Sequence, residues 1–224
     1  MMRVLAKTLL AAVLTVVVPV WAQSAYVAGR DYDVISPALR TADPETIEVT
    51  EFFAYSCGHC YNFEPLLSRW KKTLAEDVAV VPSPAIWNEP MERLARAYYT
   101  AQVLDVLEPL HLALFQAIHV DRRRLASADA IGDVFVAHGV DEAEFEAAFD
   151  SFGVSSMVRQ ADARARAARI AGTPEMMVNG KYRITTRKAG GHAEMLAIAD
   201  FLIAKERETV SAASVSGATS GGAQ

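Results

Sequence analysis

Both cysteines of the chain stand in one tetrapeptide, Cys57-Gly58-His59-Cys60, so any thiol chemistry must take place there. Two intervening residues suit an exchangeable disulfide or one half of a zinc site. A zinc site would need two further ligands, and the other histidines show no ligand spacing: His111, His119, His138 and His192. Covalent haem attachment requires a histidine directly after the second cysteine, where Tyr61 stands. A purely stabilising disulfide would close too short a loop to remove much chain entropy. We therefore predict redox exchange, with no metal and no cofactor.

The flanking segments place the tetrapeptide at a strand-to-helix junction. Residues 46–55 are rich in β-branched and aromatic types, which predicts a central strand. The next segment has an apolar stripe at helical spacing, formed by Phe63, Leu66, Leu67, Trp70 and Leu74. One helical step back from Phe63 puts Cys60 on this buried stripe. Cys57 is then expected at the helix tip, close to free backbone amides, with Ser56 able to cap the helix.

This arrangement predicts two unequal cysteines. Free amides and the positive end of the helix macrodipole stabilise a thiolate at Cys57, and His59 adds a cationic or hydrogen-bonding neighbour. A stabilised thiolate favours the reduced dithiol, which makes the corresponding disulfide a stronger oxidant. The sequence thus predicts an oxidising centre.

The remaining elements predict an α/β fold that is interrupted by helices. Val78–Val81 reads as a second strand, whereas residues 88–152 contain no strand candidate. Their helical segments are Met91–Leu107, Leu110–His119, Ala128–His138 and Glu142–Phe149, separated by Pro109, Ser127 and Gly139. A helix over Ser155–Ala171 follows. Asn179-Gly180 between two short apolar runs predicts a β-hairpin, and His192–Lys205 predicts a closing helix.

The first residues predict export. Arg3 and Lys7 precede an apolar stretch too short to span a bilayer, and small residues end at Ala22, so we expect a signal peptide over 1–22 in preference to a membrane anchor. Its removal would leave 202 residues and change the net charge from −5 to −7. An acidic chain has no electrostatic footprint for nucleic acid. Export also places the cysteines where disulfides persist, and we expect the periplasm.

Two stretches together carry a family resemblance. The segment from Glu51 to Tyr61, which includes both cysteines, and the pair Gly172-Thr173-Pro174 with Val178-Asn179-Gly180-Lys181-Tyr182 resemble the DsbA family of periplasmic thiol–disulfide oxidoreductases. The resemblance extends over most of the chain after residue 22. It implies a thioredoxin fold with an inserted all-helical domain, in which a cis-proline loop lies against the first cysteine.

The resemblance also implies a role for each matching residue. Cys57 would be the attacking sulfur and Cys60 the resolving one, while His59 tunes the thiolate. Pro174 would be the cis-proline and Thr173 would present backbone groups to a substrate peptide. Glu51 would be a buried acid that assists proton transfer near Cys60. Phe52 and Phe53 beside Glu51 favour its burial, although an exposed edge-strand residue is the alternative from the residues alone; Pro174 could be an ordinary trans turn.

Gly58 and Thr173 stand where the best-known member of the family has Pro and Val, so we expect a somewhat weaker oxidant. The expected domains are a thioredoxin-like unit from 23–87 and 155–210, a helical insertion over 88–154 and a disordered tail over 211–224. We expect a monomer that oxidises reduced exported polypeptides and is itself reoxidised by a quinone-linked membrane partner of the DsbB type. The alternatives are a reductase or isomerase for few clients, and a peptide-binding module with an incidental disulfide.

Overall fold

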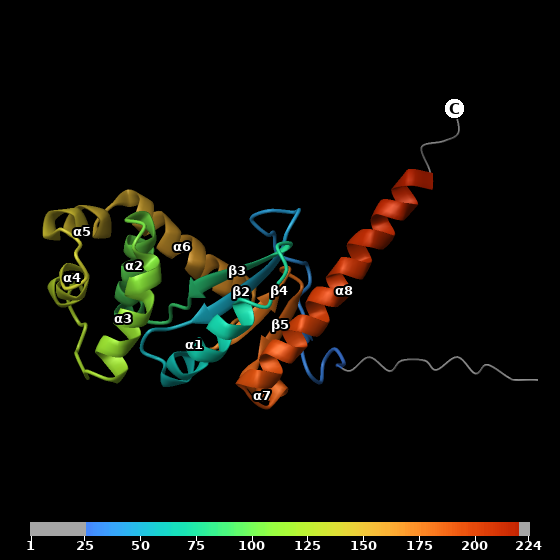
Figure 1. Cartoon of the computed structure of the whole chain (residues 1–224), viewed down its shortest axis with the longest axis horizontal. Helices are drawn as coiled ribbons and strands as arrows, with labels where there is room; N and C mark the ends of the chain where they lie inside the picture. Colours follow the sequence, from blue (N-terminus) through green and yellow to red (C-terminus); the bar gives the residue numbers. More distant parts are fainter. Residues whose placement is uncertain (1–25, 220–224) are drawn as a thin grey trace, which may run out of the picture.

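The computed structural model describes the backbone of residues 26–219 and the side chains of residues 26–209, and the predicted signal peptide lies outside them. A five-stranded sheet in the order β1-β5-β4-β2-β3 forms the centre (Figure 1). Only β2 and β3 run parallel; the other neighbouring strands are antiparallel. The strands are β1 Asp33–Val34, β2 Ile47–Phe53, β3 Val78–Pro84, β4 Glu175–Val178 and β5 Tyr182–Thr185.

Strand β2 is central, as predicted, and every one of its residues is buried. Alternate residues of a strand point to opposite faces. On one face, Val49 packs in a cluster with side chains of the helices α1 (Gly58–Lys71) and α8 (His192–Thr219). On the other face, Phe52 packs against Ala165 and Ala168 at the end of α6 (Phe152–Ala167). Helices therefore cover both faces, and the short α7 (Thr186–Ala189) links β5 to α8.

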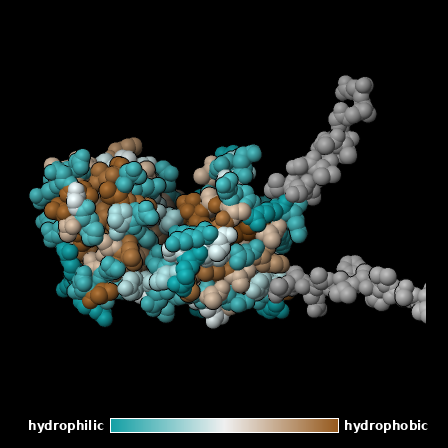
Figure 2. Space-filling view, in the orientation of Figure 1, coloured by the Kyte–Doolittle hydropathy of each residue, from teal (hydrophilic) through white to brown (hydrophobic). Residues whose placement is uncertain are grey.

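Four further helices form the insertion at one end of the sheet (Figure 1). They are α2 Glu89–Val103, α3 Leu107–His119, α4 Ala128–Val136 and α5 Glu142–Phe149. Their shared core also includes Phe53, Tyr55 and Cys60, so the insertion packs directly on the end of β2 and on the cysteine motif. Figure 2 shows apolar residues gathered over this helical group on the face in view.

Some predicted boundaries of the helices were wrong. Pro109 does not separate two helices; it lies in the first turn of α3, where the missing amide hydrogen costs no helical bond. The break falls earlier, at Asp105, whose φ of +56° is left-handed. Helix α8 runs to Thr219, whereas we expected this helix to end at Lys205. Extending an existing helix requires no new nucleation, and the added residues include alanines. Within 26–219, no helix is long and apolar enough to cross a membrane.

The predicted hairpin forms between β4 and β5, with Asn179 and Gly180 both at positive φ. Gly180 also lies against the backbone of Leu39, in the segment between β1 and β2. Its carbonyl accepts a hydrogen bond of 2.9 Å from the amide of Leu39, and a Cβ built on Gly180 would lie 2.1 Å from the Leu39 carbonyl oxygen. Glycine is therefore required here for its conformation and for its size.

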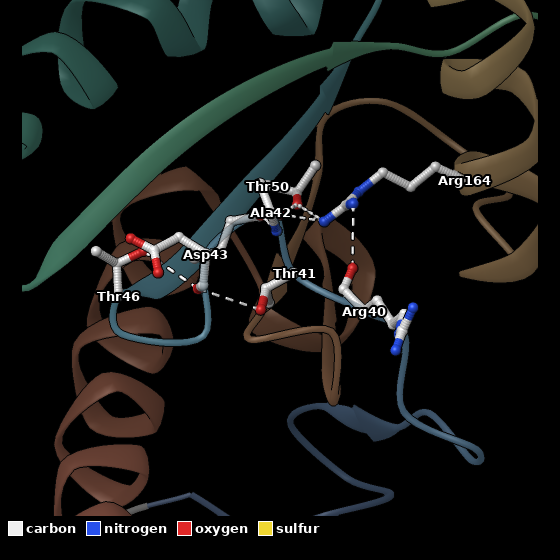
Figure 3. Close-up of polar contacts among 8 residues, drawn as sticks. Arg40, Thr41, Ala42, Asp43, Thr46, Thr50 and Arg164 are labelled. Carbon is white, nitrogen blue, oxygen red and sulfur yellow. Dashed lines mark hydrogen bonds and ion pairs between the residues drawn. The ribbon is translucent and has the colours of Figure 1, made fainter.

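A buried ion pair holds α6 against β2. The guanidinium of Arg164 binds the carboxylate of Glu48 and donates to the hydroxyl of Thr50 at 3.0 Å. Figure 3 shows Arg164 reaching from α6 toward Thr50 and the loop before β2. In this loop, the guanidinium of Arg164 donates to the carbonyl of Arg40 at 3.4 Å, and the amide of Ala42 donates to the carboxylate of Glu48 at 2.9 Å. A buried carboxylate is stable here because it is paired and fully hydrogen-bonded.

We predict that Gly180→Ala destabilises the protein far more than Gly190→Ala. Both glycines have positive φ, +66° and +82°, but nothing lies within 4 Å of a Cβ at Gly190. Gly190→Ala should therefore cost only the conformational penalty of about 1 kcal/mol. Gly180→Ala should cost at least ~2 kcal/mol more, because the hairpin or the Leu39 backbone must move. Chemical denaturation of the two variants measures the difference, and equal losses would contradict the account of the close approach.

Candidate active site

The cysteine motif lies where β2 ends and α1 begins. Cys57 itself occupies the N-cap position, with extended backbone angles, and no side chain caps the helix. The prediction that Ser56 caps α1 is wrong: the helix starts at Gly58, and Ser56 lies exposed in the preceding turn. The first amides of α1 are consequently left for the sulfur of Cys57, which stands where a capping oxygen usually stands.

Cys57 is half-buried and carries a free thiol. Its Sγ lies 3.3 Å from the carbonyl oxygen of Thr173, to which the protonated thiol donates. The pKa of Cys57 is lowered to about 5, first by a hydrogen bond from the Cys60 thiol and further by hydrogen bonds from Thr173 and from the amides of Cys60 and His59, against the opposing effect of burial. At neutral pH this sulfur is a thiolate.

Cys60 has the opposite environment. Its side chain is fully buried on the inward face of α1, as the helical spacing predicted. Burial raises the pKa of Cys60 far above its usual range, and the neighbouring Cys57 raises it further. Cys60 therefore stays protonated at neutral pH, and it must lose a proton before it can attack a disulfide.

The Thr173-Pro174 segment lies directly against the motif, although 116 residues separate Thr173 from Cys57. The peptide bond between Thr173 and Pro174 is cis, and β4 begins at the next residue. The carbonyl of Pro174 accepts a hydrogen bond of 2.9 Å from the hydroxyl of Thr186. A cleft of about 330 Å³ borders this segment and is lined also by Arg187 and Lys188.

Glu51 is completely buried on β2, and neither of its carboxyl oxygens has a hydrogen-bond partner among the described residues. It lies between Val49 and Phe53 on the strand face that α1 covers, and the side-chain cluster around Phe53 contains Cys60. Burial and, to a smaller extent, the charge of Glu64 raise the pKa of Glu51 to about 8, against the opposing charge of Lys71. Glu51 is therefore mostly protonated at neutral pH. Glu48, on the opposite face of the strand, has Arg164 as a partner, whereas Glu51 has none among the described residues.

Glu64 connects this region to the insertion. It lies on α1 one turn beyond Cys60, and its Oε1 lies 3.2 Å from Nε2 of His111 on α3. Nδ1 of the same imidazole lies 2.9 Å from the hydroxyl of Tyr55. The insertion thus supplies polar partners to the helix that carries both cysteines.

One histidine lies within the motif and two others lie beside it. His59 is exposed on α1, and its ring packs edge-to-face on that of His192 with centroids 6.3 Å apart. Burial lowers the pKa of His192, the charge of His59 lowers it further, and Cys57 opposes this. His119, at the end of α3, lies beside the motif, with its Nε2 2.8 Å from the carbonyl oxygen of Tyr55. The sequence indicated only His59, because His119 and His192 lie 60 and 133 residues after it and reach the motif only through the docking of their helices.

Comparisons with known proteins identify the family. A model of the DSBA-like thioredoxin domain matches residues 67–202. The thiol:disulfide interchange protein DsbA of Bordetella parapertussis is 39% identical over 207 residues, which cover 92% of this chain and 97% of that protein. The chain belongs to the DsbA family. The corresponding protein of Pseudomonas aeruginosa is 37% identical over 182 residues, 81% of this chain and 86% of that protein.

Solved structures of DsbA proteins agree with this assignment. A crystal structure of Pseudomonas aeruginosa DsbA superimposes with a TM-score of 0.80 at 36% identity, covering 83% of this chain and 97% of that chain. DsbA from Xylella fastidiosa gives a TM-score of 0.77 at 33% identity, covering 82% and 98%. The predicted thioredoxin fold with a helical insertion is confirmed. The protein is a thiol:disulfide oxidoreductase of the DsbA type.

We predict that Glu51→Gln removes a pH dependence from the stability of the protein. Because the folded pKa is raised to about 8, the unfolded chain releases this proton first as the pH rises. The wild type should therefore lose roughly 2–5 kcal/mol of stability relative to the variant between pH 4.3 and about 8. Denaturant unfolding at several pH values measures the difference.

Glu48→Gln is the matched control, since Glu48 is buried on the same strand. It should destabilise the protein at neutral pH by about 1–3 kcal/mol, because Arg164 loses a charged partner. If the stability difference between wild type and Glu51→Gln does not change with pH, Glu51 does not carry the proton that its burial indicates.

Proposed function

We propose that the oxidised protein acts in the periplasm and donates the Cys57–Cys60 disulfide to newly exported polypeptides. The observation that carries this proposal is the inequality of the two thiols. The pKa of Cys57 is lowered to about 5, whereas that of Cys60 is strongly raised. A stabilised Cys57 thiolate favours the dithiol form of this protein and makes its disulfide oxidising.

In the proposed reaction, a substrate thiolate attacks Sγ of Cys57, which is the accessible sulfur. A disulfide forms between the substrate and Cys57, and the electrons of the broken bond pass to Cys60. A second substrate thiolate then attacks the mixed disulfide, and Cys57 leaves as a stabilised thiolate. The substrate gains a disulfide and this protein becomes a dithiol.

Cys60 needs a proton when it leaves, because its thiolate is buried. We assign this proton to the carboxyl of Glu51, which is protonated at neutral pH and lies on the strand face covered by α1. In the reverse direction the same carboxylate would accept the proton from Cys60, so that Cys60 can resolve a mixed disulfide.

The remaining predicted residues are assigned to thiolate tuning and substrate binding. The backbone amide of His59 stabilises the Cys57 thiolate, and its exposed imidazole adds a titratable group beside it. Thr173 and Pro174 offer backbone groups next to Sγ of Cys57, where an extended peptide can dock. A cleft also borders Thr173 and Pro174, and we assign the continuation of the substrate chain to it.

Turnover requires an oxidant for the dithiol. We assign this role to a quinone-linked membrane protein of the DsbB type. The Cys57 thiolate would attack a disulfide of that protein, and Cys60 would then attack the mixed disulfide, which restores the Cys57–Cys60 bond and leaves the partner as a dithiol. The protein is proposed to act as a monomer. The family to which the chain belongs supports these assignments.

Two measurements test the proposal together. The redox potential in glutathione buffers should lie well above about −270 mV, the value for thioredoxin, which is a reductant. A reduced peptide should attack Cys57 in two forms of the protein. One is oxidised wild type, and the other is Cys60→Ser whose Cys57 has first been converted to a mixed disulfide with a small thiol. Cys57→Ser should form no mixed disulfide and no product.

A potential near that of thioredoxin would favour the reductase or isomerase alternative, which Gly58 and Thr173 make worth testing. If Cys57→Ser kept full activity in a cellular assay of disulfide formation, the peptide-binding alternative would replace the proposal. Reoxidation is tested with membranes that contain a DsbB-type protein and quinone.

A further inference from the structure

His119 is the last residue of α3, and it extends from the helical insertion to the cysteine motif. Its Nε2 lies 2.8 Å from the carbonyl oxygen of Tyr55, two residues before Cys57. Its ring stacks on that of Tyr61, with centroids 5.2 Å apart and planes at 12°. Two independent contacts therefore hold this imidazole in one orientation beside the active site.

The contact with Tyr55 determines where the proton of His119 lies. A carbonyl oxygen can only accept a hydrogen bond, so Nε2 must carry the hydrogen. In the neutral imidazole, Nδ1 is then the basic nitrogen with a free lone pair. Within the described part of the chain, no group forms a hydrogen bond with this Nδ1.

Gly58 leaves that basic edge uncovered. A Cβ built on Gly58 would lie 3.9 Å from Cε1 and 4.0 Å from Nδ1 of His119, which is ordinary contact distance. A larger residue is therefore sterically tolerable at this position, but it would cover the imidazole edge. Gly58 is exposed and directly follows Cys57, so Nδ1 lies beside the residue next to the attacking sulfur.

We propose that His119 is a catalytic residue of the exchange reaction, whose Nδ1 accepts the proton of the substrate thiol that docks at Cys57. The inference rests on the proposed attack at Cys57. Imidazole is the side chain suited to this task at neutral pH, because its charge changes between pH 5 and 8. An ordinary substrate thiol has a pKa of about 8.5 and is only about 1% thiolate at pH 6.5.

The proton and electron balance of the step is complete. The substrate S–H bond breaks, its proton passes to Nδ1, and the sulfur keeps the electron pair. That sulfur attacks Cys57, and Cys60 leaves with the electrons of the old disulfide and takes a proton from Glu51. His119 later releases its proton to solvent, and Glu51 takes up a proton from solvent. The second substrate thiol loses its proton to solvent, and its sulfur attacks the substrate sulfur of the mixed disulfide and displaces Cys57 as a thiolate.

The groups around the imidazole are compatible with this role. Helix α1 contributes the phenol of Tyr61 and the motif itself, and the turn before it contributes the Tyr55 carbonyl. From α3, Phe115 faces the ring. Within the described residues, no carboxylate from these elements or from α2 and α4 forms an ion pair with His119. Glu64 is occupied instead by His111.

The test compares oxidised wild type with His119→Gln, whose amide can still donate to Tyr55 but cannot accept a proton at neutral pH. The rate of mixed-disulfide formation with a single-cysteine peptide is measured from pH 5.5 to 9. At pH 6.5 the variant should be slower by about tenfold, within the limit of about a hundredfold that complete deprotonation of the thiol would give. At pH 9, where the peptide is already a thiolate, the two rates should agree within about twofold.

His138→Gln is the matched control, because His138 also contacts a backbone carbonyl at 2.8 Å, that of Val134 on α4. It should match wild type at every pH. The redox potential of His119→Gln should also be unchanged. An equal slowing at all pH values would show a positioning role only, and no slowing would refute the proposal.

The outcome remains decisive if His119→Gln does not fold. The wild-type rate should then fall less steeply below pH 7 than the thiolate fraction of the peptide. If it follows that fraction strictly to pH 5.5, the inference is overturned. Failure of oxidised wild type to react with thiols at any pH would instead contradict the proposed function.

Discussion

The uncapped start of α1 is the constraint on which the site depends. Helices usually satisfy their first amides with a side-chain oxygen, but here the sulfur of Cys57 occupies that position. Its hydrogen-bonding neighbours, which include Cys60 and Thr173, hold negative charge on that sulfur. Because the first amides of α1 lack another acceptor, they stabilise the Cys57 thiolate. This stabilisation favours the reduced protein and makes its disulfide more oxidising.

The rest of the fold keeps this arrangement in place and gives the two buried glutamates of β2 different surroundings. Strand β2 carries two buried glutamates on opposite faces. Glu48 is neutralised by Arg164 and fastens α6 to the sheet, whereas Glu51 has no partner and faces the helix that carries the cysteines. One buried acid thus contributes to architecture, and the other retains its proton on the face of β2 that α1 covers, where we propose that it serves Cys60.

Much of the fold and the pair of cysteines could be predicted from sequence because the signals are local. Helical spacing placed Cys60 inward and Cys57 at the helix tip, and Asn179-Gly180 located the hairpin. The neighbours that come from distant elements could not be predicted without the resemblance. His119 and His192 reach the motif only because α3 and α8 dock there, which no local pattern encodes. The expected cap at Ser56 failed since helix starts shift easily by one residue.

The central claim is that thiolate stabilisation at Cys57 drives the exchange. The direct measurement is the difference in unfolding free energy between the reduced and oxidised protein as a function of pH. Since the folded pKa of Cys57 is lowered to about 5, its stabilisation of the reduced form is complete above the unfolded pKa of about 8.5 and disappears as the pH falls through 5. The account predicts that the reduced protein is the more stable form at pH 7 and that its advantage shrinks toward pH 5. A more stable oxidised form at pH 7, or a difference that does not vary with pH, would contradict it.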